Sequence, residues 1–228
     1  MSQQLSRFNF GGMADSYDEW YKTRLGRTYD ALEKRAVKRM LPDPTTANRL
    51  LDVGCGTGHW SAFFGEQGFV VTGVDISPEM IEVAREKRIA NASFEVADAH
   101  SLPFENGRFD VAAAITTLEF VRDPEVVIRE MVLCTRRPGG LVLVGVLNAL
   151  AQVNRLRKAA GEPPYNTARL FSPRELKGIL ARHGEARVAS TTFIPLSVSL
   201  LTLAPVTDAI GRIFRLPHGA FVVGTVRL

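Results

Sequence analysis

Residues 50–58, Leu-Leu-Asp-Val-Gly-Cys-Gly-Thr-Gly, decide how this chain folds. A short apolar run leads into a turn in which Gly54, Gly56 and Gly58 alternate with other residues. Glycine accepts positive φ freely and lets a ligand approach bare backbone. A helix that begins near Thr57 directs its free N–H groups at whatever occupies the turn. The stretch predicts a buried strand, a ligand-binding turn and a helix, with a tight turn that binds nothing as the alternative.

Acidic residues follow two further apolar runs. Asp75 ends the run 69–74, and Asp98 comes after the run 92–96. An acid at the end of the second strand of a βαβ unit can accept both hydroxyls of a ribose. The Asp98 carboxylate is suited to accept from an exocyclic amine, and the Ala99 N–H to donate to a ring nitrogen. Each acid alone is more often a solvated loop residue. The glycine turn, Asp75 and Asp98 together, in this order along the chain, predict a nucleoside site at one edge of a sheet.

Strand and helix patterns alternate along the chain. Helices are predicted where Ser77-Pro78, Asp123-Pro124 and Ser172-Pro173 supply an N-cap and a proline at the first helical position. The alternation predicts an α/β fold, a doubly wound and mainly parallel sheet with helices on both faces. The predicted strands are 50–53, 69–74, 92–96, 109–115, 141–146, 186–194 and 220–226.

Four motifs in order, LLDVGCGTG, VDISPEMIEVAR, VADAHSLPFENGRFD and RPGGLVLVGVLN, resemble those of the class I S-adenosylmethionine-dependent methyltransferases. The similarity is greatest to the small-molecule branch that includes the quinone-biosynthesis and type 11 enzymes, and it is close over residues 49–148. It implies a Rossmann-like methyltransferase fold of seven strands whose last strand is antiparallel, with S-adenosylmethionine as cofactor. The glycine turn then holds the methionine part, the second-strand acid the ribose, and the third-strand acid the adenine amine. The cofactor-binding residues so implied are Asp52, Gly54, Cys55, Gly56, Asp75, Ile76, Asp98, Ala99 and Thr116.

Two segments are expected to surround the acceptor. Residues 1–42 are predicted to form N-terminal helices that roof the site, and residues 43–228 to form the core. The aromatic face of Tyr17, Trp20 and Tyr21 fits either a roof or plain packing.

An apolar insertion is predicted at about residues 195–217. Its part from Leu196 to Phe214 is expected near the acceptor, with Leu200 and Leu203 making the pocket apolar. A helix packed on the edge of the sheet is the alternative.

Candidate catalytic groups are few. Methyl transfer from a sulfonium requires alignment and exclusion of water, and a general base only where the acceptor must lose a proton. By position, His59, His100 and Glu119 are candidate bases, and Tyr17 and Tyr21 are candidates for orienting the acceptor. For each candidate base, the alternative interpretation is that the side chain shapes the pocket and does not take up a proton.

Composition excludes several classes of protein. The 228 residues carry a net charge of +4 and suit one α/β domain. The two cysteines lie far apart, so no disulfide framework and a cytoplasmic location are expected. The four histidines lack metal-ligand spacing, so no metal is predicted. No signal peptide is seen at the start, and Pro195 and Pro205 argue against a transmembrane helix in the uncharged run 188–207.

Charge is spread unevenly along the chain. From residue 151 onward the chain has eleven Lys and Arg and four Asp and Glu, which gives a net charge of +7. The rest of the chain carries a net charge of −3. This basic third fits an anionic substrate or membrane surface, or simply scattered solvated arginines. Nucleic acid is not expected as a partner, because the basic residues are neither dense nor interleaved with aromatics.

The favoured function is methyl transfer from S-adenosylmethionine to a small, lipophilic or aromatic acceptor. The alternative is a regulatory or partner domain that binds S-adenosylmethionine without catalysis. A nicotinamide oxidoreductase is disfavoured, since the turn reads G-x-G-x-G and not G-x-G-x-x-G. The sequence does not indicate the acceptor atom or the oligomeric state.

Overall fold

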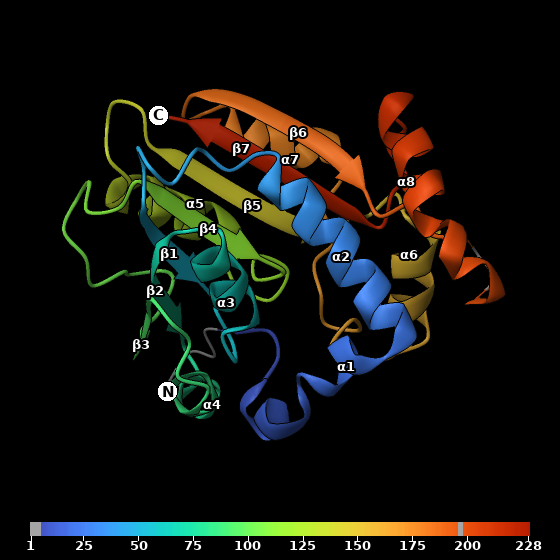
Figure 1. Ribbon diagram of the computed structural model, residues 1–228, viewed down its shortest axis with the longest axis horizontal. Helices are drawn as coiled ribbons and strands as arrows, with labels where there is room; N and C mark the ends of the chain where they lie inside the picture. Colours follow the sequence, from blue (N-terminus) through green and yellow to red (C-terminus); the bar gives the residue numbers. More distant parts are fainter. Residues whose placement is uncertain (1–5, 196–197) are drawn as a thin grey trace.

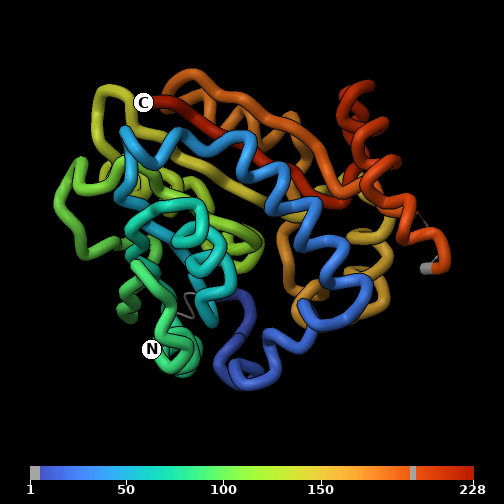
Figure 2. Tube along the Cα trace, in the orientation of Figure 1, coloured from blue at the N-terminus to red at the C-terminus, as the bar shows by residue number. Residues whose placement is uncertain are grey.

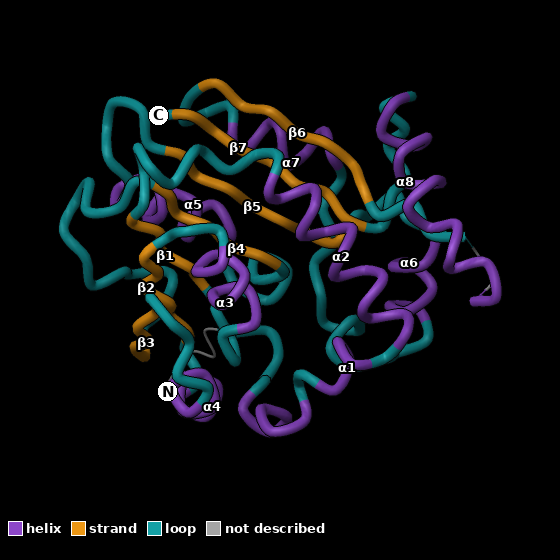
Figure 3. The backbone as a smooth tube through the Cα atoms, viewed as in Figure 1, coloured by secondary structure: helices purple, strands orange, loops and turns teal. Residues whose placement is uncertain are grey.

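A computed structural model describes residues 6–195 and 198–228, and within these residues seven strands form one sheet in the order β3-β2-β1-β4-β5-β7-β6 (Figures 1 and 3). β7 runs antiparallel to β5 and β6, and the other pairs are parallel. The prediction of a doubly wound, mainly parallel sheet with an antiparallel last strand is confirmed. The strands are β1 (Arg49–Val53), β2 (Val70–Asp75), β3 (Ala92–Val96), β4 (Val111–Ile115), β5 (Leu141–Leu147), β6 (Glu185–Thr191) and β7 (Phe221–Arg227).

Helices cover both faces of the sheet. In Figure 1, α2 and α3 lie in front of the strands and α5 and α7 behind them. One buried cluster joins α5 and α7 to the sheet, and a second joins α2 and α3 to the opposite face. The helical elements are η1 (Gly11–Ser16), α1 (Glu19–Lys22), α2 (Arg24–Lys38), α3 (His59–Glu66), α4 (Pro78–Glu86), α5 (Pro124–Cys134), α6 (Gln152–Ala159), α7 (Pro173–Leu180), η2 (Val198–Leu203) and α8 (Ala204–Ile213).

Capping side chains begin three of the helices as predicted. Ser77 accepts from the Met80 amide at the start of α4. Asp123 caps α5, and Ser172 with Glu175 forms a capping box at the start of α7. α6 was not predicted, because its N-cap residue makes no side-chain bond and its sequence is strongly polar. Local hydrogen-bonding side chains therefore mark the helices that the sequence predicts best.

The N-terminal segment, residues 6–22, lies against the edge of the sheet that carries the glycine turn. Ser6 forms an isolated bridge with Val121, and the Arg7 amide donates to the Phe120 carbonyl at 2.6 Å. η1 packs against α4, as the blue segment beside α4 in Figure 2 shows. The segment therefore joins elements that follow β2 and β4.

The connection from β6 to β7 departs from prediction. β6 ends at Thr191 and not near 194, because Thr192 adopts a left-handed φ of +67° that breaks the extended backbone. The uncharged run is thus divided between a strand and the short helices η2 and α8. Leu200 and Leu203 are each 48% exposed and line neither of the cavities described below, so the structure gives no support to their predicted contact with the acceptor. The described part of the chain has no helix long and apolar enough to cross a bilayer.

Candidate active site

A cleft, here called the main cleft, lies where β1, β2, β3 and β4 end. Eight of the nine residues that the sequence assigns to cofactor binding line it. They are Gly54, Cys55, Gly56, Asp75, Ile76, Asp98, Ala99 and Thr116. Because the carboxyl ends of parallel strands meet at one edge, loops far apart in sequence converge on one ligand site.

The glycine turn contains two glycines with different physical roles. Gly54 and Gly56 both adopt positive φ, +71° and +52°. A Cβ on Gly54 would lie 2.2 Å from the Thr117 side chain, so close packing requires glycine there. A Cβ on Gly56 would meet no atom within 4 Å. Gly56 therefore presents bare backbone to open space in the main cleft, as a close-fitting cofactor needs.

Asp75 ties the end of β2 to this turn. One carboxylate oxygen accepts from the Gly56 amide at 2.9 Å, and the other accepts from the Ser77 amide at 2.9 Å. Burial raises the pKa of Asp75, although these two bonds oppose the shift. A buried carboxylate that already orients the turn is well placed to accept from the hydroxyls of a ribose.

Asp98 and His100 form a second fixed unit in the main cleft. The carboxylate of Asp98 accepts from the amide of His100 at 2.9 Å and from its Nδ1 at 2.7 Å. The Nε2 of His100 accepts from the Asp123 amide at 3.3 Å. Both ring nitrogens are thus engaged within the protein, so His100 orients Asp98 and is a poor candidate for an acceptor's base.

His59 is engaged in a similar way. Its Nε2 lies 2.7 Å from the Asp30 carboxylate. Its ring stacks on Tyr21 with centroids 3.6 Å apart and planes 10° apart. Burial raises the pKa of Tyr17 to about 12 and also raises the pKa of Tyr21. At neutral pH both phenols keep their protons, so they can donate a hydrogen bond but cannot serve as bases.

Two predicted acids lie outside the site. Asp52 accepts from the Ser61 hydroxyl at 2.6 Å beneath the turn, and burial raises its pKa to about 7. One carboxylate oxygen of Glu119 accepts from the Leu147 amide at 2.6 Å, and the other has no partner among the residues described. Burial raises the pKa of Glu119 to about 8. Neither side chain lines the main cleft, which argues against Asp52 as a cofactor ligand and Glu119 as a base.

Thr116 follows β4 with a left-handed φ of +51°. Backbone strain in a residue other than glycine is typical of functional positions. Its side chain lines the main cleft and also the cavity beside it. Thr116 therefore stands at the junction of two compartments.

That second cavity, here called the aromatic chamber, was not predicted. It brings together N-terminal helices, the residues that follow β4 and the loop after α6. Its aromatic walls are Phe10, Tyr17, Trp20, Tyr21, Tyr29, Trp60, Phe120 and Tyr165. The guanidinium of Arg157 lies 5.5 Å from the centre of the Tyr29 ring and 5.0 Å from that of Tyr165. Separate segments build this wall, so only the folded chain reveals it.

Glu33 is the buried carboxyl in the wall of the chamber, whereas Glu162, which also lines it, is exposed. It is 8% exposed, and the described residues offer its carboxylate no hydrogen bond or ion pair. Burial raises its pKa to about 8, helped by the charges of Asp30 and Glu119. The sequence could have indicated Glu33, because it is an acid within the apolar stripe of α2 that includes Leu32, Ala36 and Val37.

Asp18 is a further residue that sequence reasoning missed. Its carboxylate accepts from the Thr57 hydroxyl at 2.8 Å and forms an ion pair with Lys87. Lys87 also donates to the Thr57 carbonyl at 2.7 Å. These contacts fasten the N-terminal segment to the glycine turn.

The two cysteines are not joined in a disulfide. Cys55 and Cys134 are free and buried. Across residues 6–195 and 198–228, no three His, Cys, Asp or Glu side chains gather in a way that could hold a metal ion.

Comparison with known proteins agrees with this geometry. A family model described as a methyltransferase domain matches residues 18–188. An uncharacterized protein of Mycobacterium tuberculosis is 32% identical over 180 residues, which cover 76% of this chain and 59% of that protein. The malonyl-[acyl-carrier protein] O-methyltransferase of Serratia marcescens is 30% identical over 132 residues, which cover 56% of this chain and 51% of that enzyme. The chain therefore spans between half and two thirds of the length of these two relatives.

A crystal structure of similar fold comes from Thermotoga maritima. It is a SAM-dependent methyltransferase described as a possible histamine N-methyltransferase. The TM-score is 0.74 at 26% identity, and the match covers 96% of this chain and 97% of that one. With the motifs in order and a family model that matches residues 18–188, the chain belongs to the methyltransferase domain family, the class I fold that uses S-adenosylmethionine.

Proposed function

We propose that this protein transfers a methyl group from S-adenosylmethionine to a small acceptor held in the aromatic chamber. One observation carries the proposal: the main cleft and the chamber share six lining residues, so ligands in the two compartments would lie against each other. The shared residues are Phe10, Tyr17, Tyr21, Trp60, Thr116 and Phe120. Juxtaposed compartments are what a reaction between a bound donor and a bound acceptor requires.

On the cofactor side, Gly56 would hold the methionine part against bare backbone, and Asp75 would hold the ribose. Asp98, fixed by His100, would accept from the adenine amine, and the Ala99 amide would donate to the ring. When bound, S-adenosylmethionine supplies a methyl group on a positively charged sulfur, which needs no activation by the protein. The chain's own residues then bind, orient and exclude water.

On the acceptor side, the chamber favours an aromatic or lipophilic body with one polar group. Its aromatic walls offer stacking and edge-to-face contacts. Glu33 is the partner available for the polar group, because its carboxyl lines the chamber and makes no hydrogen bond there. The arrangement is compatible both with a relative named as an O-methyltransferase and with a structural neighbour described as a possible histamine N-methyltransferase. Residues 6–42, the described part of the predicted roof, would cover the site, with Asp18 as its attachment to the turn; residues 1–5 lie outside the described residues.

The test is a turnover screen with phenol, amine and carbon-acid acceptors, read as formation of S-adenosylhomocysteine. For the acceptor that turns over, Glu33→Gln at pH 7 should raise KM about 2- to 12-fold, since burial keeps Glu33 mostly protonated and a neutral hydrogen bond contributes about 0.5–1.5 kcal/mol. The Kd for S-adenosylmethionine should stay within about twofold. The matched control is Glu105→Gln, which changes an exposed carboxyl away from both compartments.

A cofactor-binding domain without catalysis is the rival function. Binding of S-adenosylmethionine with no turnover on any acceptor class would favour that rival. Equal losses of cofactor and acceptor affinity in Glu33→Gln would remove Glu33 from the acceptor site.

A further inference from the structure

The outward side of α8 and the residues around it form an unusually apolar surface. Leu203, Val206, Ile210 and Ile213 are spaced three or four residues apart, so they lie on one side of the helix. Ile213 is 75% exposed and Phe214 is 71% exposed. The surface, here called the apolar face, consists of Leu203, Val206, Ile210, Ile213, Phe214 and Leu216. Six of the thirteen large exposed apolar side chains among the described residues lie on this short stretch.

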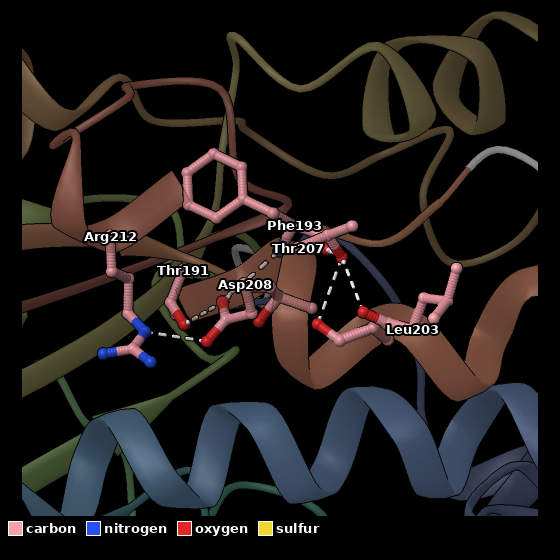
Figure 4. Close-up of polar contacts among 8 residues, drawn as sticks. Thr191, Phe193, Leu203, Thr207, Asp208 and Arg212 are labelled. Carbon is pink, nitrogen blue, oxygen red and sulfur yellow. Dashed lines mark hydrogen bonds and ion pairs between the residues drawn. The ribbon is translucent and has the colours of Figure 1, made fainter. Parts of the chain in front are cut away.

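The opposite side of α8 is held firmly against the sheet. The Asp208 carboxylate accepts from the Thr191 hydroxyl at 2.9 Å and from the Thr192 amide at 2.6 Å, and it pairs with Arg212 at 2.7 Å (Figure 4). Gly211 allows the helix to approach the Phe193 ring, where a Cβ would lie 2.3 Å away. The polar and small residues thus point inward, and α8 presents the apolar face outward on a fixed support.

The surroundings of the apolar face are basic. From residue 186 to the last residue, Asp208 is the only acid, and it is buried in its pair with Arg212. Arg215 is exposed between Phe214 and Leu216. Helix α2 contacts α8 and carries Arg35 and Lys38 in its last turn, with Arg39 as its C-cap.

We propose that the apolar face docks onto an anionic lipid surface, with α8 lying in the plane of the membrane interface. An apolar stripe beside basic residues is the pattern of helices that insert shallowly between lipid headgroups. The cations would face the negative headgroups, and Ile213 and Phe214 would enter the acyl boundary. A two-fold contact with a second copy is less favoured, because it would bring each apolar face with its own arginines against the same arginines of the other copy.

Vesicle co-sedimentation tests the proposal without any assumption about enzyme activity. The full chain should bind vesicles of phosphatidylcholine mixed equally with phosphatidylglycerol, and should bind pure phosphatidylcholine much less. Binding should fall at about 0.5 M NaCl, where the Debye length is about 4 Å. Ile213→Ser combined with Phe214→Ser should lower partitioning at least about tenfold, from the loss of two buried apolar side chains.

Two variants sharpen the result. Leu133→Ser removes an exposed leucine on α5, far from α8 in sequence, and should leave partitioning unchanged. Arg215→Glu keeps the apolar side chains and should weaken binding to the anionic vesicles only. If circular dichroism shows that the double variant does not fold, Arg215→Glu and the salt dependence of the wild-type chain still test the proposal.

Three outcomes would overturn the proposal. The first is a wild-type chain that does not sediment with the anionic vesicles. The second is binding that is equal on neutral vesicles and insensitive to salt. The third is a dimer, detected by light scattering, that dissociates in the double variant and would assign the apolar face to a second copy.

Discussion

Replacing Gly56 by alanine should separate cofactor binding from folding. The backbone there has φ +52°, which costs a residue with a Cβ about 1–2 kcal/mol. The alanine also reduces the conformational entropy of the unfolded chain, which stabilises the folded state by about 0.4–1 kcal/mol. Because the new methyl group would meet no protein atom within 4 Å, no steric term is added. The free energy of unfolding should therefore fall by only about 1 kcal/mol.

Cofactor binding should suffer much more. The methyl group of Gly56→Ala would stand in the space where a ligand presses against the turn. Overpacking of a fitted contact costs about 1–3 kcal/mol, equivalent to a rise in Kd of about 5- to 150-fold. Gly139→Ala is the matched control, because Gly139 also has positive φ, +90°, and open space around its Cα, but it lies away from the main cleft.

Isothermal titration with S-adenosylmethionine and urea denaturation measure the two effects. Gly139→Ala should lose at least as much stability as Gly56→Ala, because φ +90° lies beyond the left-handed region open to alanine, and only Gly56→Ala should lose affinity. Normal affinity in a folded Gly56→Ala protein would show that the turn does not contact the cofactor. Equal losses of affinity in both variants would show that strain alone, and not the occupied space, weakens binding.

Three further predictions concern buried and cleft acids. Asp75→Ala should weaken S-adenosylmethionine binding by about 1.5–3 kcal/mol, the range for hydrogen bonds to a charged group. An unchanged affinity, measured by calorimetry in a folded variant, would contradict the assignment of Asp75 to the ribose. Asp98→Ala should raise the Kd for S-adenosylmethionine but not that for methionine, which lacks adenine; equal losses for both ligands would contradict a role specific to the base. Burial raises the pKa of Glu119 from 4.5 to about 8, so its stabilising effect is complete below pH 4.5 and is lost as pH rises through 8. The free energy of unfolding in urea should thus fall over that range, less steeply in Glu119→Gln, and an equally steep fall in the variant would exclude Glu119 as the cause.

Much of the sheet could be predicted because the central strands β1, β4 and β5 are mostly buried apolar runs. Val111 to Ile115, for example, is buried at all five positions, since helices cover both faces there. Helices with a serine or aspartate cap were also predicted correctly. The boundary of β6 was missed, because nothing in the sequence near Thr192 signals a left-handed backbone.

The cofactor residues could be predicted better than the acceptor site. The former follow strand ends, so their order along the chain carries their position. Asp52 was misplaced because adjacency to the turn does not reveal which side of β1 it occupies, and it faces Ser61 on α3. Glu33 and Arg157 meet only through packing between distant helices, a relation that no local pattern encodes.

The Asp18 contact with Thr57 has a kinetic consequence. Residues of the N-terminal segment line the main cleft, and Asp18 anchors that segment to the turn through Thr57 and Lys87. We expect the exchange of spent for fresh cofactor to require release of this anchor, so the rate of exchange should depend on the Asp18–Thr57 contact. Weakening a single carboxylate outside the reaction centre would hasten product departure and at the same time shorten the residence of the donor.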